Sequence, residues 1–200
     1  MSNQDDLPLT LSKDKKMTKG LDLSHYNGKQ DFEKLKAQGF EFCYFKATEG
    51  LSYVDPTFLG NVRAASAAGI LTGAYHFFRP SVDGTDQARH FLSTTALLPL
   101  NLPHMLDWEV TDSVRASIQK VRATSWLENV KAVTGKIPGI YGSPGFLEPL
   151  GLDDSFKNYP LWVAHYGVNR PRIPSPWGDY MYWQYTDANG LDLDVFNGVF

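Results

Sequence analysis

The sequence predicts an α/β fold, namely a barrel of largely parallel strands with crossover helices around it. Four or five times along the chain, a short apolar segment is followed by a segment whose apolar residues recur at helical spacing. This alternation is typical of βα units. Eight strand-like segments occur in all, a number that suits closure into a barrel. An open doubly wound sheet is the alternative, although no Gly-x-Gly-x-x-Gly or phosphate-binding loop supports a nucleotide site.

The expected strands are short, apolar and bounded by turn residues. They cover residues 19–24, 41–47, 71–78, 104–110, 138–143, 161–166, 180–186 and 191–196. In the first of them, Leu21 and Leu23 share one face, while Asp22 and Ser24 share the other.

Helices are expected after each of the first four strands, over residues 31–38, 55–68, 83–97 and 112–134. Asp31 is a suitable N-cap for the first, and Asp55-Pro56 predicts the start of the second because proline favours the first helical position. In the fourth, apolar residues from Val114 to Val130 follow helical spacing, and Gly135 ends it.

The last third of the chain differs from the rest. Residues 167–178 contain three prolines and must be a loop, and no clear helix separates the last three strands. Residues 1–17 show no periodicity and are expected to be a flexible N-terminal tail. Residues 18–200 are then one barrel domain, a size that buries one core.

Composition excludes several classes of function. The net charge is −3, the pI is near 5.9, and no basic run occurs, which argues against nucleic acid and membrane surfaces as partners. No segment has the roughly 18–20 apolar residues of a membrane helix. The single Cys43 excludes an internal disulfide. The N-terminus carries no recognisable signal peptide, so we expect synthesis in the cytoplasm. We also expect the protein to be a monomer.

Two acids, Asp107 and Glu109, end the strand expected at 104–110. Residues i and i+2 of a strand share a face, with Cα atoms roughly 6.5–7 Å apart. Two close carboxyls in a partly dry site raise one pKa, and such a carboxyl can act as an acid at neutral pH. The alternative to a catalytic pair is that the two acids are solvated or form ion pairs with Lys or Arg.

In a closed barrel, further acids come to the same rim, because active sites lie at the carboxyl ends of the strands. Asp22 ends the first strand, and Asp192 and Asp194 lie in the eighth, next to the first. The five histidines form no zinc motif, so we expect no metal and no cofactor. Glycoside hydrolysis, which uses two carboxyl groups, fits better. Aromatic residues that could hold sugar rings lie near strand ends: Tyr75, Tyr141, Trp162 and Tyr166.

Eight segments, in order from residue 18 onwards, resemble glycoside hydrolase family 25, the Chalaropsis-type lysozymes. They are Gly20-Leu-Asp-Leu-Ser24, Lys46-Ala-Thr-Glu-Gly50, Gly73-Ala-Tyr-His-Phe77, Asp107-Trp-Glu109, Ile140-Tyr-Gly142, Leu161-Trp-Val-Ala164, Trp183-Gln-Tyr-Thr186 and Leu191-Asp-Leu-Asp194. The resemblance implies an irregular TIM-like β/α barrel of five βα units followed by three strands. It also implies an N-acetylmuramidase that cuts the β-1,4 bond between N-acetylmuramic acid and N-acetylglucosamine in peptidoglycan glycan strands.

The resemblance implies a role for single residues as well. Glu109 matches the proton donor and Asp107 its partner acid, with Asp22 and Asp192 as further acids of the catalytic rim. Lys46 and Gln184 lie in matching segments and are expected to bind substrate, as are the four aromatic residues above. One departure is Asp194, where many relatives have Asn; its carboxylate could face the rim or be a solvated replacement.

Mechanism and biological role stay open at this point. A carboxyl separation of about 5–5.5 Å suits a direct nucleophile, and about 6.5–9.5 Å suits inversion through water. We favour a third route, retention assisted by the substrate's acetamido group under the guidance of Asp107. A chitinase-like glycosidase is disfavoured by Met105 and Pro103, where further Asp residues would be expected. An inactive peptidoglycan-binding barrel is the other alternative. The cell wall would be reached by pore-mediated release, lysis or other export, as for a phage lysin or a bacterial effector.

Overall fold

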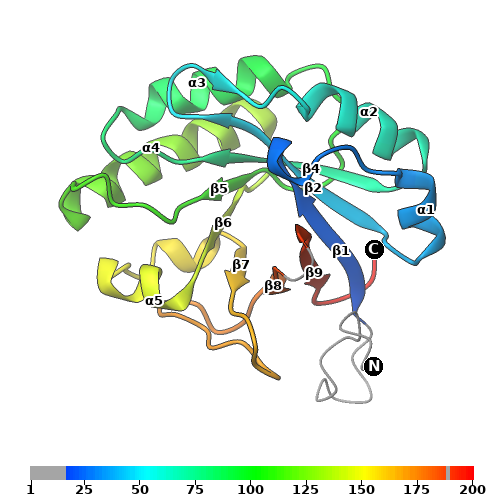
Figure 1. Cartoon of the computed structure of the whole chain (residues 1–200). Helices are drawn as coiled ribbons and strands as arrows, with labels where there is room; N and C mark the ends of the chain where they lie inside the picture. The colour runs from blue at the N-terminus through cyan, green and yellow to red at the C-terminus, as the bar shows by residue number, and fades with distance from the viewer. Residues whose placement is uncertain (1–16, 188–189) are drawn as a thin grey trace.

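The computed structural model describes residues 17–187 and 190–200 and shows a closed α/β barrel (Figure 1). Its strands are β1 Thr18–Leu23, β2 Phe42–Glu49, β3 Tyr53–Val54, β4 Leu71–Phe77, β5 Met105–Asp107, β6 Gly139–Gly142, β7 Leu161–Ala164, β8 Tyr182–Thr186 and β9 Asp192–Phe196. They follow the order β1-β9-β8-β7-β6-β5-β4-β2-β3, and β1 also pairs with β2, which closes eight strands into a barrel. The open doubly wound alternative is therefore wrong.

The α-helices lie outside the sheet and follow the first strands in turn (Figure 1). They are α1 Phe32–Ala37, α2 Phe58–Ala67, α3 Gly84–Thr95, α4 Ala116–Thr134 and α5 Pro144–Leu147. Short 3-10 helices cover His25–Asn27, Glu148–Leu150 and Phe156–Asn158. Five βα units followed by three strands are thus confirmed. Within the described residues, no helix is both long enough and apolar enough to cross a membrane.

The helix ends follow local side-chain chemistry. The Asp31 carboxylate accepts from the backbone N–H of Lys34 and caps α1, as predicted. Asp83 caps α3 by accepting from the N–H groups of Thr85 and Asp86. Gly135 ends α4 with a φ of 69°, a left-handed conformation that glycine adopts at little cost.

Strand β9 is antiparallel to both neighbours, β1 and β8, while the other barrel pairs are parallel. The first residue of β9 therefore lies at the same rim as the last residues of β1 and β8. This reversal brings Asp192 opposite Asp22 in the register. The expected neighbourhood of the first and last strands is confirmed, whereas the sequence did not predict the direction of the last strand.

Two hydrophobic clusters fill the molecule. The larger lies between sheet and helices and includes Trp108, Trp126 and Trp183. The smaller, with Phe42, Tyr44, Tyr75, Leu102, Met105, Trp162 and Tyr182 as buried members, collects aromatic rings on the opposite face of the strands. Glycines on neighbouring strands make room for it: a Cβ on Gly20 would lie 2.3 Å from the Phe42 ring, and one on Gly73 would lie 2.3 Å from the Tyr44 ring. This aromatic packing forms the floor beneath the acids described below.

Some boundaries differ from the predictions. Helix α2 begins at Phe58 rather than at Asp55-Pro56; the turn before it is held by the Asp55 carboxylate, which accepts from the backbone N–H groups of His25 and Thr57. Helix α4 begins at Ala116 rather than at Asp112, since Asp112 and Ser113 have φ values of 47° and 59°, which a right-handed helix cannot contain.

Strand ends differ too. Strand β5 stops at Asp107, so Glu109 lies in the following loop and not on the strand. Strand β2 continues to Glu49 because its end pairs with β3, a two-residue strand that the sequence did not predict. Helix α5 was not predicted from the residue pattern, although the five βα units that the resemblance implies require a fifth helix. The tail expected over residues 1–17 lies outside the described residues except for Met17.

Candidate active site

A cavity of about 220 Å³ opens at the carboxyl ends of the parallel strands. We call it the acid-lined cavity; its lining is Asp22, Tyr75, Asp107, Glu109, Tyr141, Trp162, Tyr166, Gln184 and Asp192. All nine residues were candidates from the sequence. Of the ten candidates, Lys46 alone is absent from this lining. The barrel thus brings together side chains separated by up to 170 positions in the sequence.

The acids Asp107 and Glu109 enter the cavity from one short segment. Between them, Trp108 is fully buried and points into the helix-side core, where its indole N–H donates to Gln119 Oε1 at 3.1 Å. Since Trp108 is held on the far side, its two neighbours face the cavity although the strand has already ended. Both acids therefore share one side, as expected, but the buried Trp108 between them is the reason and not the alternation of a strand.

Burial raises the pKa of Asp107 well above its ordinary value, and the nearby charges of Glu109 and Asp22 raise it further. Desolvation also raises the pKa of Glu109, and Asp192 adds to the rise, although the Glu109 side chain is exposed at the mouth of the cavity. The carboxyls are coupled, because the charge on one disfavours charge on the others. A carboxyl that is exposed to a ligand and still has a raised pKa suits a proton donor.

Lys46 is the cation that opposes these shifts. Its charge lowers the pKa of both Asp107 and Glu109. The side chain is 8% exposed, and its Nζ lies 2.7 Å from Glu49 Oε2 and 4.6 Å from the Phe77 ring centroid. Lys46 therefore acts on the two acids through the electrostatic effect of its charge. Its position does not support the expected contact with substrate.

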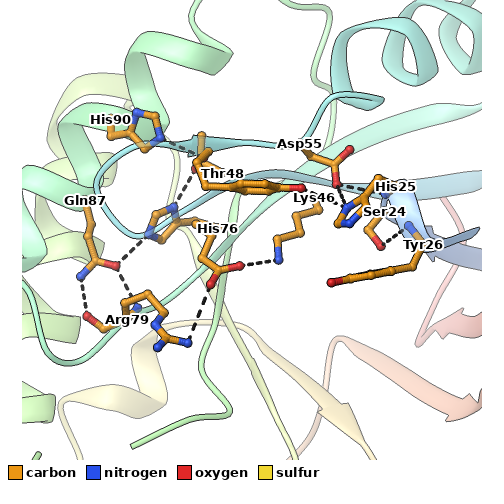
Figure 2. A network of polar contacts seen from close by, with 12 residues as sticks. Ser24, His25, Tyr26, Lys46, Thr48, Asp55, His76, Arg79, Gln87 and His90 are labelled. Atoms are coloured by element: carbon orange, nitrogen blue, oxygen red, sulfur yellow. Dashed lines mark hydrogen bonds and ion pairs between the residues drawn. The ribbon is translucent and has the colours of Figure 1, made fainter. Parts of the chain in front are cut away.

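A polar network holds this lysine in place (Figure 2). Arg79 Nη1 lies 3.7 Å from Glu49 Oε1, and Nη2 lies 2.9 Å from Asp112 Oδ1. The Arg79 backbone N–H donates to Gln87 Oε1, which also lies 3.0 Å from His76 Nε2. Buried among these groups, His76 has a pKa lowered to about 3 and serves as a neutral structural link, not as a metal ligand.

The opposite wall of the cavity is built around Gln184. Its Nε2 donates to Asp22 Oδ2 at 2.6 Å. Its Oε1 accepts from the hydroxyl of Tyr141 at 2.7 Å and from that of Tyr166. The amide nitrogen and the amide oxygen are therefore both hydrogen-bonded to other side chains of the protein. Gln184 thus orients one acid and two tyrosines.

The aromatic candidates differ in how much ring they expose. Tyr166 is 42% exposed and can offer its ring to a ligand, whereas Tyr75 is 8% and Trp162 only 2% exposed. The Trp162 indole N–H donates to Asp194 Oδ1 at 2.8 Å. Trp162 is thus mainly part of the floor, and Tyr166 is the better candidate for stacking on a sugar.

Asp194 lies below the rim. It is fully buried, so the expectation of a solvated replacement is wrong, and it does not line the acid-lined cavity. Burial raises its pKa well above the ordinary value, and the adjacent Asp22 adds to the rise. Within the described residues, no group of three or more His, Cys, Asp and Glu side chains is arranged to hold a metal ion.

A second hollow, of about 470 Å³, shares Glu109, Tyr141 and Tyr166 with the acid-lined cavity. The rest of its wall includes His165 and Arg172. Glu109 therefore stands where two hollows meet, a suitable place for a group that acts on a bond between two units of a polymer. The sequence did not identify His165 or Arg172, because they lie beyond strand β7 and carry no motif spacing.

Comparison with known proteins agrees with this geometry. The sequence profile of glycosyl hydrolases family 25 matches residues 21–192. The chain is 37% identical over 192 residues to the uncharacterized protein YegX of Escherichia coli (strain K12), covering 90% of this chain and 70% of that one. It is 32% identical over 198 residues to lysozyme M1 of Streptomyces globisporus, covering 90% and 67%.

A solved structure shares the fold. The crystal structure of the bacterial lysozyme from Streptomyces coelicolor superimposes with a TM-score of 0.85 at 31% identity, over 90% of this chain and 92% of that one. The family profile spans most of the barrel, from β1 to the first residue of β9. The chain therefore belongs to family 25 of the glycosyl hydrolases and is a glycoside hydrolase.

Proposed function

We propose that this protein hydrolyses peptidoglycan as an N-acetylmuramidase, at the β-1,4 bond between N-acetylmuramic acid and N-acetylglucosamine. The family supports glycoside hydrolysis, and the two Streptomyces relatives named as lysozymes support the substrate. One observation carries the proposal: Asp107 and Glu109 line one cavity, and the pKa of each is raised.

In this proposal, Glu109 is the general acid. Its raised pKa favours the protonated form that a general acid needs, and its position between the two hollows matches a bond that joins two sugars. Glu109 gives this proton to the glycosidic oxygen as the bond to the anomeric carbon breaks. The resulting carboxylate later takes a proton from the water that completes hydrolysis.

Asp107 is proposed to guide the substrate's own acetamido group. Its Oδ1 is buried and has no hydrogen-bond partner among the described residues, so it is available to accept the acetamido N–H. The acetamido oxygen then attacks the anomeric carbon while the leaving oxygen takes the proton of Glu109. Water opens the cyclic intermediate, which gives net retention of configuration. Asp22 and Asp192 add negative charge near the positively charged transition state.

The test is digestion of purified peptidoglycan with wild type and Glu109→Gln, followed by borohydride reduction and identification of the new sugar alcohol. We expect muramitol from wild type and a rate roughly 10²–10⁴-fold lower for Glu109→Gln. The control is Glu33→Gln, the same chemical change at an exposed position of α1. Glucosaminitol would reverse the bond specificity. Binding without any new reducing end would instead indicate an inactive binding barrel.

The mechanism has its own test. Acetamido assistance forms no ester with the protein, so mass spectrometry of enzyme quenched during turnover should show only the unmodified chain mass. A glycosyl ester on Asp107 would contradict the assisted route and make Asp107 a direct nucleophile.

A further inference from the structure

Below the acid-lined cavity lies a second carboxyl contact that the proposed mechanism does not use. Asp194 pairs with Gly20 of β1 and Gln184 of β8 in the barrel register, and its side chain is fully buried. One oxygen, Oδ1, accepts from the Trp162 indole N–H at 2.8 Å. The other, Oδ2, is buried and has no donor among the described residues if Asp194 is ionised.

Asp22 is the group that meets Asp194. It is 6% exposed, and its Oδ2 accepts from Gln184 Nε2 at 2.6 Å. The two carboxyls are within side-chain hydrogen-bonding contact of each other. Carboxylate oxygens only accept, so this contact is a hydrogen bond only if one of the two acids carries a proton. Two ionised carboxyls in contact, both removed from water, would repel strongly.

We propose that Asp194 and Asp22 share one proton, and that Asp194 is the positioning residue that holds the Asp22 carboxylate at the rim by donating this proton to it. The inference rests on the proposed function for its catalytic consequence, but the shared proton is a property of the fold itself.

The surroundings place the proton on Asp194. From β1 it faces Asp22; from β2, Tyr44; from β8, Tyr182; and on its own strand, Asp192. These groups are neutral or acidic and so disfavour a charge on Asp194. Burial is the largest cause that raises the pKa of both acids well above ordinary values, and each accepts a hydrogen bond from one neutral donor, Asp194 from Trp162 and Asp22 from Gln184. The contact between the two carboxyls raises the pKa of Asp194 and lowers that of Asp22, which places the proton on Asp194.

A protonated Asp194 presents a neutral donor toward Asp22. Asparagine has the same shape and also carries donor hydrogens, so Asp194→Asn should preserve the support of Asp22 without any titratable group. Alanine removes the donor and should let the Asp22 carboxylate turn or take up the proton itself. The two substitutions therefore separate loss of the donor from loss of the acid.

The experiment combines a spectroscopic and a kinetic measurement. The infrared difference spectrum between wild type and Asp194→Asn at neutral pH should show one carboxyl C=O band of a protonated acid in wild type that the variant lacks. On peptidoglycan, Asp194→Ala should lower kcat about tenfold, the effect expected for one lost hydrogen bond to a charged group, with little change in KM. Asp194→Asn should recover most of that loss. Asp154→Asn, at an exposed position, is the matched control.

Two results would overturn the proposal. The first is a difference spectrum without a protonated band, which would mean that Asp194 is ionised. The second is a kcat for Asp194→Asn as low as that of Asp194→Ala, which would mean that a neutral donor does not support Asp22. If wild type cleaves no peptidoglycan, the proposed function fails, and the infrared band still decides whether the proton is shared. Because Asp194→Asn is nearly isosteric, the spectrum can be read even if the alanine variant does not fold.

Discussion

Lys46 sets the charge balance of the acid pair. It is buried beside the cavity, bound to Glu49, and it lowers the pKa of both Asp107 and Glu109. Without it, the raised pKa of Glu109 would rise further, because the remaining neighbours are acids. This lysine therefore limits how far the pKa of Glu109 rises above its ordinary value.

We predict that Lys46→Met shifts the alkaline limb of the kcat/KM profile to higher pH. The general acid must be protonated, and removal of a nearby cation favours its protonated form. Methionine keeps much of the apolar stem of lysine and removes the ammonium group that lies over the Phe77 ring. The measurement is the pH dependence of reducing-end release, with Lys34→Met, which removes an exposed lysine on α1, as control. A limb that stays in place or moves to lower pH would contradict the role assigned to Lys46.

The site residues show what the sequence could predict. Asp107 and Glu109 were predictable from their spacing at a strand end, and Asp22 and Asp192 from closure of the barrel. The resemblance to family 25 added Lys46 and Gln184. The effect of the Lys46 charge on the pKa values of the two acids was not predictable. Its partner Glu49 lies in a segment whose sequence indicates the start of a loop. The burial of Asp194 was equally hidden, since alternation along a strand does not tell rim from floor.

At the scale of elements, the approach of α3 to α4 is the tightest contact between helices. Gly84, the first residue of α3, lies against the backbone of α4, where an added Cβ would be 1.9 Å from the carbonyl oxygen of Arg122. Thr85 and Asn129 side chains also meet across this contact, at 3.4 Å. Helix α3 packs against β2, which carries Lys46, and α4 packs against β5, which carries Asp107 to the cavity.

We predict that Gly84→Ala lowers the free energy of unfolding by about 1–3 kcal/mol, because the backbone of α4 must move to admit the methyl group. Gly60→Ala is the matched control: Gly60 lies in α2, and nothing lies within 4 Å of the Cβ that alanine would add there. That substitution should stabilise the protein by up to about 1 kcal/mol through helix propensity. Urea denaturation of both variants measures the difference. Equal effects would show that the contact with Arg122 is not tight.

Strand and helix identities were largely predictable, and directions and ends were not. The apolar segments of β1 to β7 and their helices follow the periodicities of the sequence. Nothing in residues 191–196 indicates that β9 runs antiparallel, because direction depends on the path of the loop before it. The start of α4 was missed because the left-handed φ of Asp112 and Ser113 has no simple signal in these residue types.

At the scale of the whole molecule, burial shifts the pKa values of acids upward and those of histidines downward. Folding raises the pKa of Asp22, Asp107 and Asp194 well above ordinary values, chiefly by burial. Burial lowers the pKa of His76 to about 3 and that of His104 to about 4. The buried acids and the buried histidines impose opposite pH dependence on stability. Acids with a raised pKa bind protons on folding, whereas histidines with a lowered pKa release them.

We predict from these signs that the free energy of unfolding decreases as the pH rises from 6.5 to 8. The contribution of the histidines is complete above pH 6.5, since they are then neutral in both states, and it is lost as the pH falls toward 3–4. The contribution of the buried acids is complete below their unfolded pKa near 3.8 and is lost as the pH rises through their folded values. Above pH 6.5, the acids alone therefore set the slope, at about 1.4 kcal/mol per pH unit for each proton still taken up.

Urea denaturation at several pH values measures this slope, and Asp194→Asn provides the control. The variant lacks one of the buried acids, so its stability should fall less steeply over the same range, while an exposed change such as Asp154→Asn should leave the slope as in wild type. Stability that stays constant from pH 6.5 to 8 would mean that the acids are already ionised in the folded barrel. The rim would then hold several adjacent negative charges with Lys46 as the nearby cation, and Glu109 would have no proton to give at neutral pH.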